Sequence, residues 1–146
     1  MSLLRSSSRL ADRETRSCRP CVLLVDDESA VRIVMGRYFA RQGWEVREAD
    51  DGIAAQRLLD PQAGHWFDLV ICDLRMPRFS GCDLFWWLAV HRPDAVARLV
   101  FSSGDLESPD SAKFLSEARR PVLPKPFDLG ELTRIVKEIS GPVHAA

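Results

Sequence analysis

The sequence predicts an α/β protein with a doubly wound parallel sheet of five strands and five helices. Three observations lead to this prediction. Short apolar runs alternate with longer segments of helical periodicity from residue 21 onward, and polar residues directly follow several of the apolar runs. The chain has 146 residues, which is enough for one domain with a single core. Because parallel neighbouring strands need crossover connections, this alternation favours helices on both faces of one sheet.

The first half of the predicted domain holds two strands and two helices. Residues 21–25 are continuously apolar, which is typical of a central strand buried on both faces. Residues 28–42 place apolar side chains at helical spacing, and Gly43 follows them as a residue that ends a helix. Residues 44–49 alternate apolar and polar side chains, which indicates a strand near the sheet edge. Residues 53–59 are expected to form the second helix.

The second half repeats this alternation. A loop with Pro77, Ser80 and Gly81 separates the third strand from its helix. The expected strands are residues 67–72, 97–102 and 121–123, and the expected helices are residues 82–91, 112–118 and 129–139. The folded domain is therefore expected to span residues 21–140, between an N-terminal tail or linker at 1–20 and a C-terminal tail at 141–146.

Charge and cysteine content argue against several classes of protein. The net charge is −1, and no basic stripe that would favour nucleic acid occurs outside the arginine-rich leader. No apolar run approaches the roughly 20 residues that a membrane span needs, and no apolar secretion signal is present. Cys18 and Cys21 have the spacing of half a zinc site, but the other half is missing. We expect reduced thiols and a cytoplasmic protein that neither inserts into membranes nor binds nucleic acid directly.

Polar side chains gather where the predicted strands end. Asp26 and Asp27 close the first strand, Asp73 closes the third, and Lys125 follows the fifth. Ligand sites of open α/β sheets form at this edge, so the carboxylates are expected to lie together. Crowded carboxylates repel one another and raise each other's pKa, so a divalent cation or an ammonium group is their natural partner. Oxygen ligands without sulfur favour Mg²⁺.

Four sequence motifs carry a family resemblance. They are Val-Leu-Leu-Val-Asp-Asp-Glu, Val-Ile-Cys-Asp-Leu-Arg-Met-Pro followed by Gly81, Val-Phe-Ser-Ser-Gly-Asp, and Leu-Pro-Lys-Pro-Phe. In this order and spacing they resemble the receiver domain of two-component response regulators, over about residues 20–140. The resemblance implies a flavodoxin-like, CheY-like fold with sheet order 2-1-3-4-5.

The resemblance also implies a role for each of these residues. Asp73 matches the phosphoacceptor, Ser103 the hydroxyl that moves to the phosphoryl group, and Lys125 the ammonium that pairs with it. Ser103 is preferred over Ser102 because it immediately precedes a small residue, Gly104. The implied Mg²⁺ site consists of Asp26, which orients a metal-bound water, the direct ligand Asp27, the phosphoacceptor Asp73 and the backbone carbonyl of Arg75. The Lys125-Pro126 bond is expected to be cis.

The implied function is a phosphorylation-dependent signalling switch. The phosphoryl group would come from a histidine kinase or a histidine phosphotransfer protein, and phosphorylation would change the binding of an output partner that the sequence does not identify. The chain is expected to be a regulatory domain whose only catalysis is its own phosphotransfer and dephosphorylation. It is either a stand-alone regulator or, as the residues around Lys125 favour, the carboxyl-terminal receiver of a hybrid histidine kinase.

Two other functions remain open at this point. The first is an interaction scaffold that is never phosphorylated, in which the same polar residues are helix caps and ion pairs. The second is a small phosphohydrolase of the haloacid-dehalogenase type, which also combines aspartate, serine, lysine and Mg²⁺. That enzyme class requires a carboxylate two residues after its nucleophile, and Glu28 stands two residues after Asp26.

The sequence departs from the common receiver pattern at three places. Val122 occupies a position that is aromatic in many members, so the output is expected to pass through the backbone after Ser103. Arg75 and Asp105 have opposite charges and are expected to pair beside the phosphorylation site, where Arg75 would slow hydrolysis. Trp86 is expected on the outer face of its helix, as a candidate anchor for a partner or a homodimer, or else covered by neighbouring arginine stems.

Overall fold

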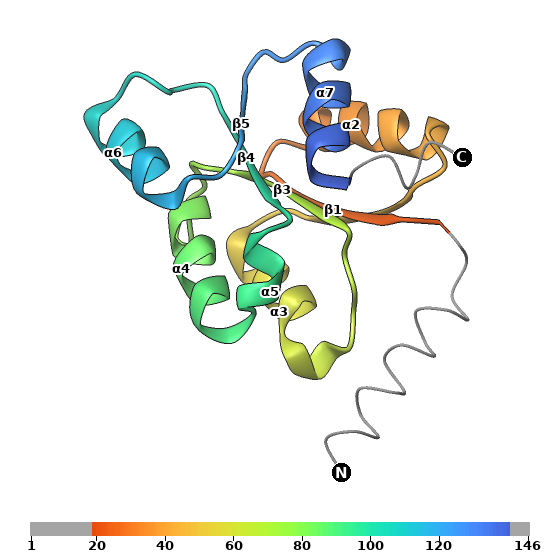
Figure 1. The fold of residues 1–146 in the computed structure, drawn as a ribbon, viewed down its shortest axis with the longest axis horizontal. Coiled ribbons are helices and arrows are strands. Elements are labelled where there is room, and N and C mark those ends of the chain that lie inside the picture. The colour runs from red at the N-terminus through yellow and green to blue at the C-terminus, as the bar shows by residue number, and fades with distance from the viewer. Residues whose placement is uncertain (1–18, 141–146) are drawn as a thin grey trace.

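A computed structural model describes residues 19–140 as one parallel sheet with helices on both faces (Figure 1). The five strands are β1 (Cys21–Val25), β2 (Glu45–Ala49), β3 (Leu69–Asp73), β4 (Leu99–Ser103) and β5 (Val122–Pro124). All neighbouring strands pair in parallel, in the order β2-β1-β3-β4-β5. The predicted fold class and strand order are confirmed. The expected tails at 1–20 and 141–146 lie almost wholly outside the described residues, as does Cys18.

The described part of the chain contains six α-helices, where five were expected. They are α2 (Ser29–Arg41), α3 (Gly52–Leu59), α4 (Gly81–His91), α5 (Pro93–Val96), α6 (Pro109–Ala118) and α7 (Leu129–Ser140), with a short 3₁₀ helix at Pro61–Ala63. The unexpected helix, α5, is a single four-residue turn. Proline is well suited to the first turn of a helix, and Pro93 starts this one.

The extra turn also explains where the fourth strand begins. The sequence predicted a strand from Ala97, but β4 starts at Leu99. The Arg98 N–H donates to the Ala95 carbonyl at 3.0 Å, so residues 97 and 98 belong to the end of the α5 turn. The third strand is likewise shifted by one to two residues, to Leu69–Asp73, which brings Asp73 into the sheet rather than after it.

The core lies in two layers, one on each face of the sheet. Alternate side chains of β1 point to opposite faces, so Leu23 and Val25 belong to one layer, and Val22 and Leu24 to the other. The first layer packs under α3, α4 and α6, and the second packs under α2 and α7, which lie together on one face in Figure 1. The three central strands are buried on both faces, which explains their continuous apolar runs.

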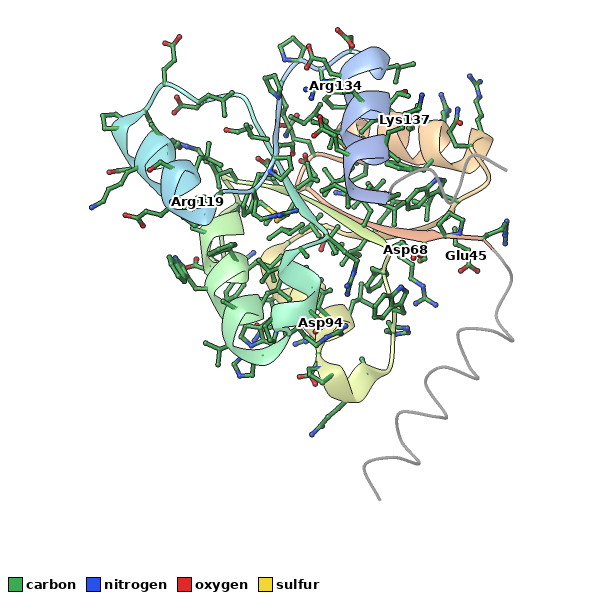
Figure 2. All side chains as sticks on the ribbon, in the orientation of Figure 1. Glu45, Asp68, Asp94, Arg119, Arg134 and Lys137 are labelled. Atoms are coloured by element: carbon green, nitrogen blue, oxygen red, sulfur yellow. The ribbon has the colours of Figure 1, made fainter. Side chains whose placement is uncertain are left out.

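Charged side chains cover the outside of this core. Arg119, Arg134 and Lys137 are among the exposed charged residues (Figure 2). Asp94, near the opposite edge of the sheet from Asp73, binds Arg92 at 2.9 Å and Arg98 at 3.2 Å. Within the described residues, no helix is both long enough and apolar enough to cross a membrane.

Candidate functional site

The carboxyl ends of four strands bring the candidate residues to one edge of the sheet. Asp26 directly follows β1, Asp73 is the last residue of β3, Ser103 is the last residue of β4 and Lys125 directly follows β5. The backbone holds the two carboxylates in place, because Asp26 donates its N–H to the Ala49 carbonyl of β2 and Asp73 pairs with Ser102 in the sheet. The fold thus brings together residues that are up to 99 positions apart in the sequence.

Lys125 bridges the two buried carboxylates. Its Nζ donates to Oδ2 of Asp26 at 2.8 Å and to Oδ2 of Asp73 at 3.2 Å. Asp26 is 3% exposed and Asp73 is 6% exposed, so their charges are shielded from water and need this partner. The peptide bond between Lys125 and Pro126 is cis, as expected.

The remaining carboxylate oxygens accept backbone hydrogen bonds. Oδ1 of Asp26 accepts the N–H of Glu28 at 2.9 Å, and Oδ1 of Asp73 accepts the N–H of Arg75 at 3.2 Å. Each of the two carboxylates is therefore held by Lys125 on one oxygen and by the backbone on the other. The rotamer of each carboxylate is set before any ligand arrives.

Burial and charge both shift the pKa values of this site, and the net shift is upward for Asp73 and for Lys125. Burial raises the pKa of Asp73 above its ordinary value, and the neighbouring Asp26 carboxylate raises it further, against the opposing effect of Lys125. Burial by itself lowers the pKa of Lys125, but its bonds and charge interactions with Asp26 and Asp73 outweigh this and raise that pKa on balance. Lys125 is therefore firmly protonated at neutral pH.

Asp26 also belongs to a group of three acidic side chains at the end of β1. The side chains of Asp26, Asp27 and Glu28 each place one carboxylate oxygen within 4.8 Å of the others, close enough to hold one metal ion. Only oxygen donors are present, which suits Mg²⁺. Asp73 is not a member of this group. Glu28 was not among the expected ligands, although the run Asp-Asp-Glu in the sequence already placed a third carboxylate there.

Ser102 and Ser103 differ in their surroundings. Both are 1% exposed, but they point to opposite faces of β4. The hydroxyl of Ser103 accepts the N–H of Asp105 at 3.1 Å, which links it to the loop beside the site. The Ser102 hydroxyl has no hydrogen-bond partner among the described residues. Of the two hydroxyls, only that of Ser103 is hydrogen-bonded within the described residues, and its partner lies in the loop after β4.

Arg75 and Asp105 form the ion pair that the sequence predicted. Nη2 of Arg75 lies 2.9 Å from Oδ2 of Asp105 and also donates to Oγ of Ser108 at 2.9 Å. Both partners of the ion pair are about half exposed, with side-chain exposures of 58% and 45%. Arg75 therefore joins the loop after β3 to the loop after β4.

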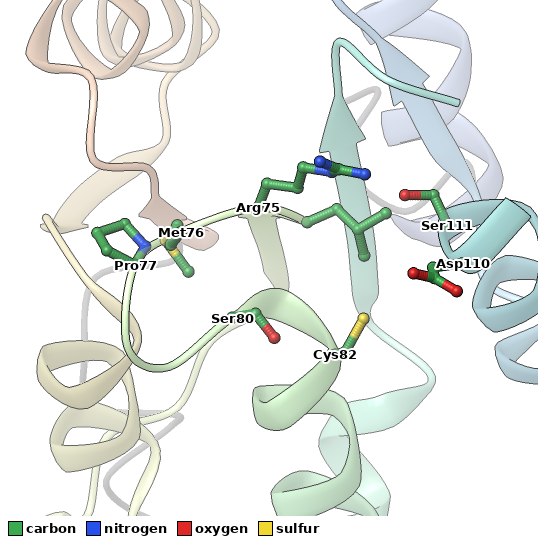
Figure 3. Close-up of a pocket in the computed structure, with 8 residues that line it drawn as sticks. Arg75, Met76, Pro77, Ser80, Cys82, Asp110 and Ser111 are labelled. Carbon is green, nitrogen blue, oxygen red and sulfur yellow. The ribbon is translucent and has the colours of Figure 1, made fainter. Parts of the chain in front are cut away.

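A pocket of about 500 Å³ lies below Arg75, between the start of α4 and the start of α6 (Figure 3). Cys82 and Ser80 line it from the α4 side, and Asp110 and Ser111 line it from the α6 side. Burial raises the pKa of the Cys82 thiol, which keeps this thiol protonated at neutral pH.

Trp86 lies on the outer face of α4, as its helical position predicted. The side chain is 53% exposed, and its indole contacts the rings of Phe85 and Phe114 edge-on. Trp87 is half-buried and stacks on His91. On β5, Val122 is half-buried. It occupies the position where the common receiver pattern has an aromatic side chain.

Comparisons with known proteins agree on one family. The family described as the response regulator receiver domain matches residues 22–137. The sensor kinase CckA of Brucella abortus is 36% identical over 118 residues, which are 81% of this chain but only 12% of that kinase. Sporulation initiation phosphotransferase F of Bacillus subtilis is 25% identical over 117 residues, and the match covers 90% of that protein. A response regulator receiver protein from Pseudomonas putida has a TM-score of 0.72 and 30% identity, with 84% of this chain and 98% of that chain covered.

Proposed function

The chain belongs to the response regulator receiver domain family, and we propose that Asp73 is the residue through which it works as a phosphorylation-dependent switch. A receiver domain is a regulatory domain that takes a phosphoryl group from a histidine kinase or a phosphotransfer protein. The observation that carries the assignment of Asp73 is the Lys125 bridge. It joins two buried carboxylates at the ends of neighbouring strands, beside the buried hydroxyl at the end of β4.

The proposed reaction transfers a phosphoryl group to a carboxylate. An oxygen of Asp73 attacks phosphorus, the bond between phosphorus and the histidine nitrogen of the donor breaks, and the imidazole leaves with the electron pair and takes up a proton. The product is an acyl phosphate on Asp73. The N–H of Arg75 and the Lys125 ammonium hold the carboxylate in position for this attack.

The residues present suit Mg²⁺, and we assign its binding to Asp26, Asp27 and Asp73 with the carbonyl of Arg75. When bound, Mg²⁺ supplies positive charge that offsets the charge of the phosphoryl group in transfer. Glu28 lies close enough to Asp26 and Asp27 to contribute to this site. With Mg²⁺ bound, the Lys125 ammonium would break its contact with Asp26 or Asp73. Its long, flexible side chain would allow the ammonium to reach the oxygens of the new phosphoryl group. Ser103 donates its hydroxyl hydrogen to another of these oxygens.

The donor protein must reach this edge of the sheet, and α2 offers a surface for it. The helix begins three residues after Asp26, and its apolar side chains Ile33 and Val34 are 51% and 52% exposed. We assign this face of α2 to the phosphoryl donor. For the receiver unit itself we propose residues 21–140, and we propose that this unit belongs to a hybrid histidine kinase; the 36% identical relative is a sensor kinase.

The test is the intact mass of the protein after incubation with acetyl phosphate and Mg²⁺. We expect one hydroxylamine-labile phosphoryl group on the native chain, none on Asp73→Asn, and one on the matched control Asp110→Asn, which changes an exposed aspartate. Continuous release of phosphate from a phosphate ester would indicate a phosphohydrolase instead. The absence of any adduct, with beryllofluoride also failing to bind, would indicate an unphosphorylated scaffold.

A further inference from the structure

Asp105 is held by Arg75, two residues after Asp73, and by Ser103, at the end of the neighbouring strand. Its carboxylate accepts from the guanidinium of Arg75, at 2.9 Å, and its backbone N–H donates to the hydroxyl of Ser103, at 3.1 Å. Arg75 is in turn two residues from Asp73 and donates its backbone N–H to that carboxylate. A new charge on Asp73 therefore acts on both anchors of Asp105 at once.

The same contacts hold the amino terminus of α6. Ser108 is the N-cap of this helix, and its hydroxyl accepts the N–H of Ser111 at 3.2 Å. Arg75 donates to that hydroxyl at 2.9 Å, and Oδ1 of Asp105 accepts the N–H of Ser108 at 3.2 Å. The cap is thus tied to the loop after β3 through Arg75 and to the loop after β4 through Asp105.

We propose that Arg75 acts as a latch on the start of α6. While Asp73 is unphosphorylated, the Arg75 guanidinium binds Asp105 and Ser108 and holds this end of the helix in place. Once Asp73 is phosphorylated, the guanidinium leaves both partners and binds the phosphoryl oxygens. This inference rests on the proposed function of Asp73. A phosphoryl group carries a charge of about −1.5 to −2 and accepts two parallel bonds from a guanidinium, so it is a stronger partner than one half-exposed carboxylate. Ser103 is drawn to the same group, and Asp105 then loses its second anchor.

Release of the latch changes the pocket below Arg75. Asp110 and Ser111, in the first turn of α6, form one wall of this pocket, and Cys82 of α4 forms the opposite wall (Figure 3). When the first turn of α6 is freed, the partly exposed Cys82 thiol becomes more accessible to water and to small reagents. This route from Asp73 to α6 does not pass through β5, which agrees with valine at position 122.

Alkylation of Cys82 by iodoacetamide measures the latch directly. The protein is labelled with and without acetyl phosphate and Mg²⁺, and peptide mass spectrometry separates Cys82 from Cys72. Cys72 is fully buried and serves as the internal control for global opening. The loss of an exposed ion pair corresponds to at most about a fivefold change in the labelling rate. We expect this increase at Cys82 on phosphorylation, and no change at Cys72.

Two variants separate the latch from the phosphorylation chemistry. Arg75→Ala should label Cys82 about fivefold faster than the native chain even without phosphorylation, with little further increase on phosphorylation. The control Arg134→Ala removes an exposed ion pair on α7 and should behave like the native chain. Intact mass of the same samples reports the adduct. An adduct on Asp73 without faster labelling of Cys82, or slow labelling of unphosphorylated Arg75→Ala, overturns the latch and leaves the proposed function standing. A chain that takes up no phosphoryl group overturns both.

Discussion

Replacing Lys125 by methionine should reveal how strongly the two site carboxylates depend on its ammonium. At an effective dielectric constant of about 20, contacts of 2.8 Å and 3.2 Å correspond to gross attractions of about 6 and about 5 kcal/mol. Desolvation offsets most of this, and breaking such buried pairs costs about 3–5 kcal/mol. Because the Lys125 side chain is still 15% exposed, we expect a loss of about 3 kcal/mol in unfolding free energy at pH 7 without Mg²⁺.

The loss should depend on pH and on Mg²⁺. Lys125 lowers the pKa of Asp73, so its removal leaves burial and the Asp26 charge, which both raise that pKa. A carboxyl group with a raised pKa binds its proton more tightly in the folded state than in the unfolded state. Stability is therefore regained as the pH falls from 7 toward the ordinary value of 3.8. Mg²⁺ supplies the missing positive charge and should stabilise the variant more than the native chain.

Urea unfolding followed by tryptophan fluorescence, at pH 7 and pH 5 with and without Mg²⁺, measures these effects. The control is Lys137→Met, which changes an exposed lysine on α7 and should cost less than about 0.5 kcal/mol under every condition. An equal loss for Lys125→Met at both pH values, unaffected by Mg²⁺, would refute the electrostatic coupling of Asp26 and Asp73 through this residue.

Three further predictions concern other parts of the molecule. Arg75→Ala should shorten the lifetime of the phosphoryl group severalfold, because water then reaches Asp73; an unchanged decay of the adduct after removal of the donor contradicts this. Asp94→Asn should lower the free energy of unfolding by about 1 kcal/mol at pH 7, a small value because the Asp94 side chain is half-exposed. Bonds from Arg92 and Arg98 lower the pKa of Asp94 to about 2, so in urea titrations the deficit should vanish as the pH falls from 4 to 2. Gly81→Ala places a Cβ 2.7 Å from the Asp73 carbonyl and should cost about 1–3 kcal/mol; native-like unfolding would contradict it.

Several features of the fold could be predicted because local and tertiary preferences agree. Residues 21–25 form β1 with the expected bounds, since a short, continuous apolar run of this length is typical of a strand buried on both faces. Gly43 has a positive φ of 86° after α2, which is the backbone conformation that its expected role requires. The α5 turn was not predicted, because four residues carry too little periodicity to be recognised.

The candidate site was predicted in part from strand ends and in part from resemblance. Strand ends placed Asp26, Asp73 and Lys125 at one edge, and the structure brings these three side chains into contact. The bond from Arg75 to Ser108 could not be foreseen, because it depends on how two loops approach each other across 33 positions of the chain. Neither residue has a local pattern that points to the other.

The sequence by itself determined where the strands lie to within two residues, which faces are apolar, and which polar groups end at the same edge. These properties follow from the period of side-chain direction along the backbone, which every residue carries locally. The tertiary structure alone decided that Lys125 lies between two particular carboxylates and that Arg75 also binds Ser108, the cap of α6. Contacts of about 3 Å between side chains of separate loops depend on loop conformation and rotamers, which packing selects only when the whole domain has formed.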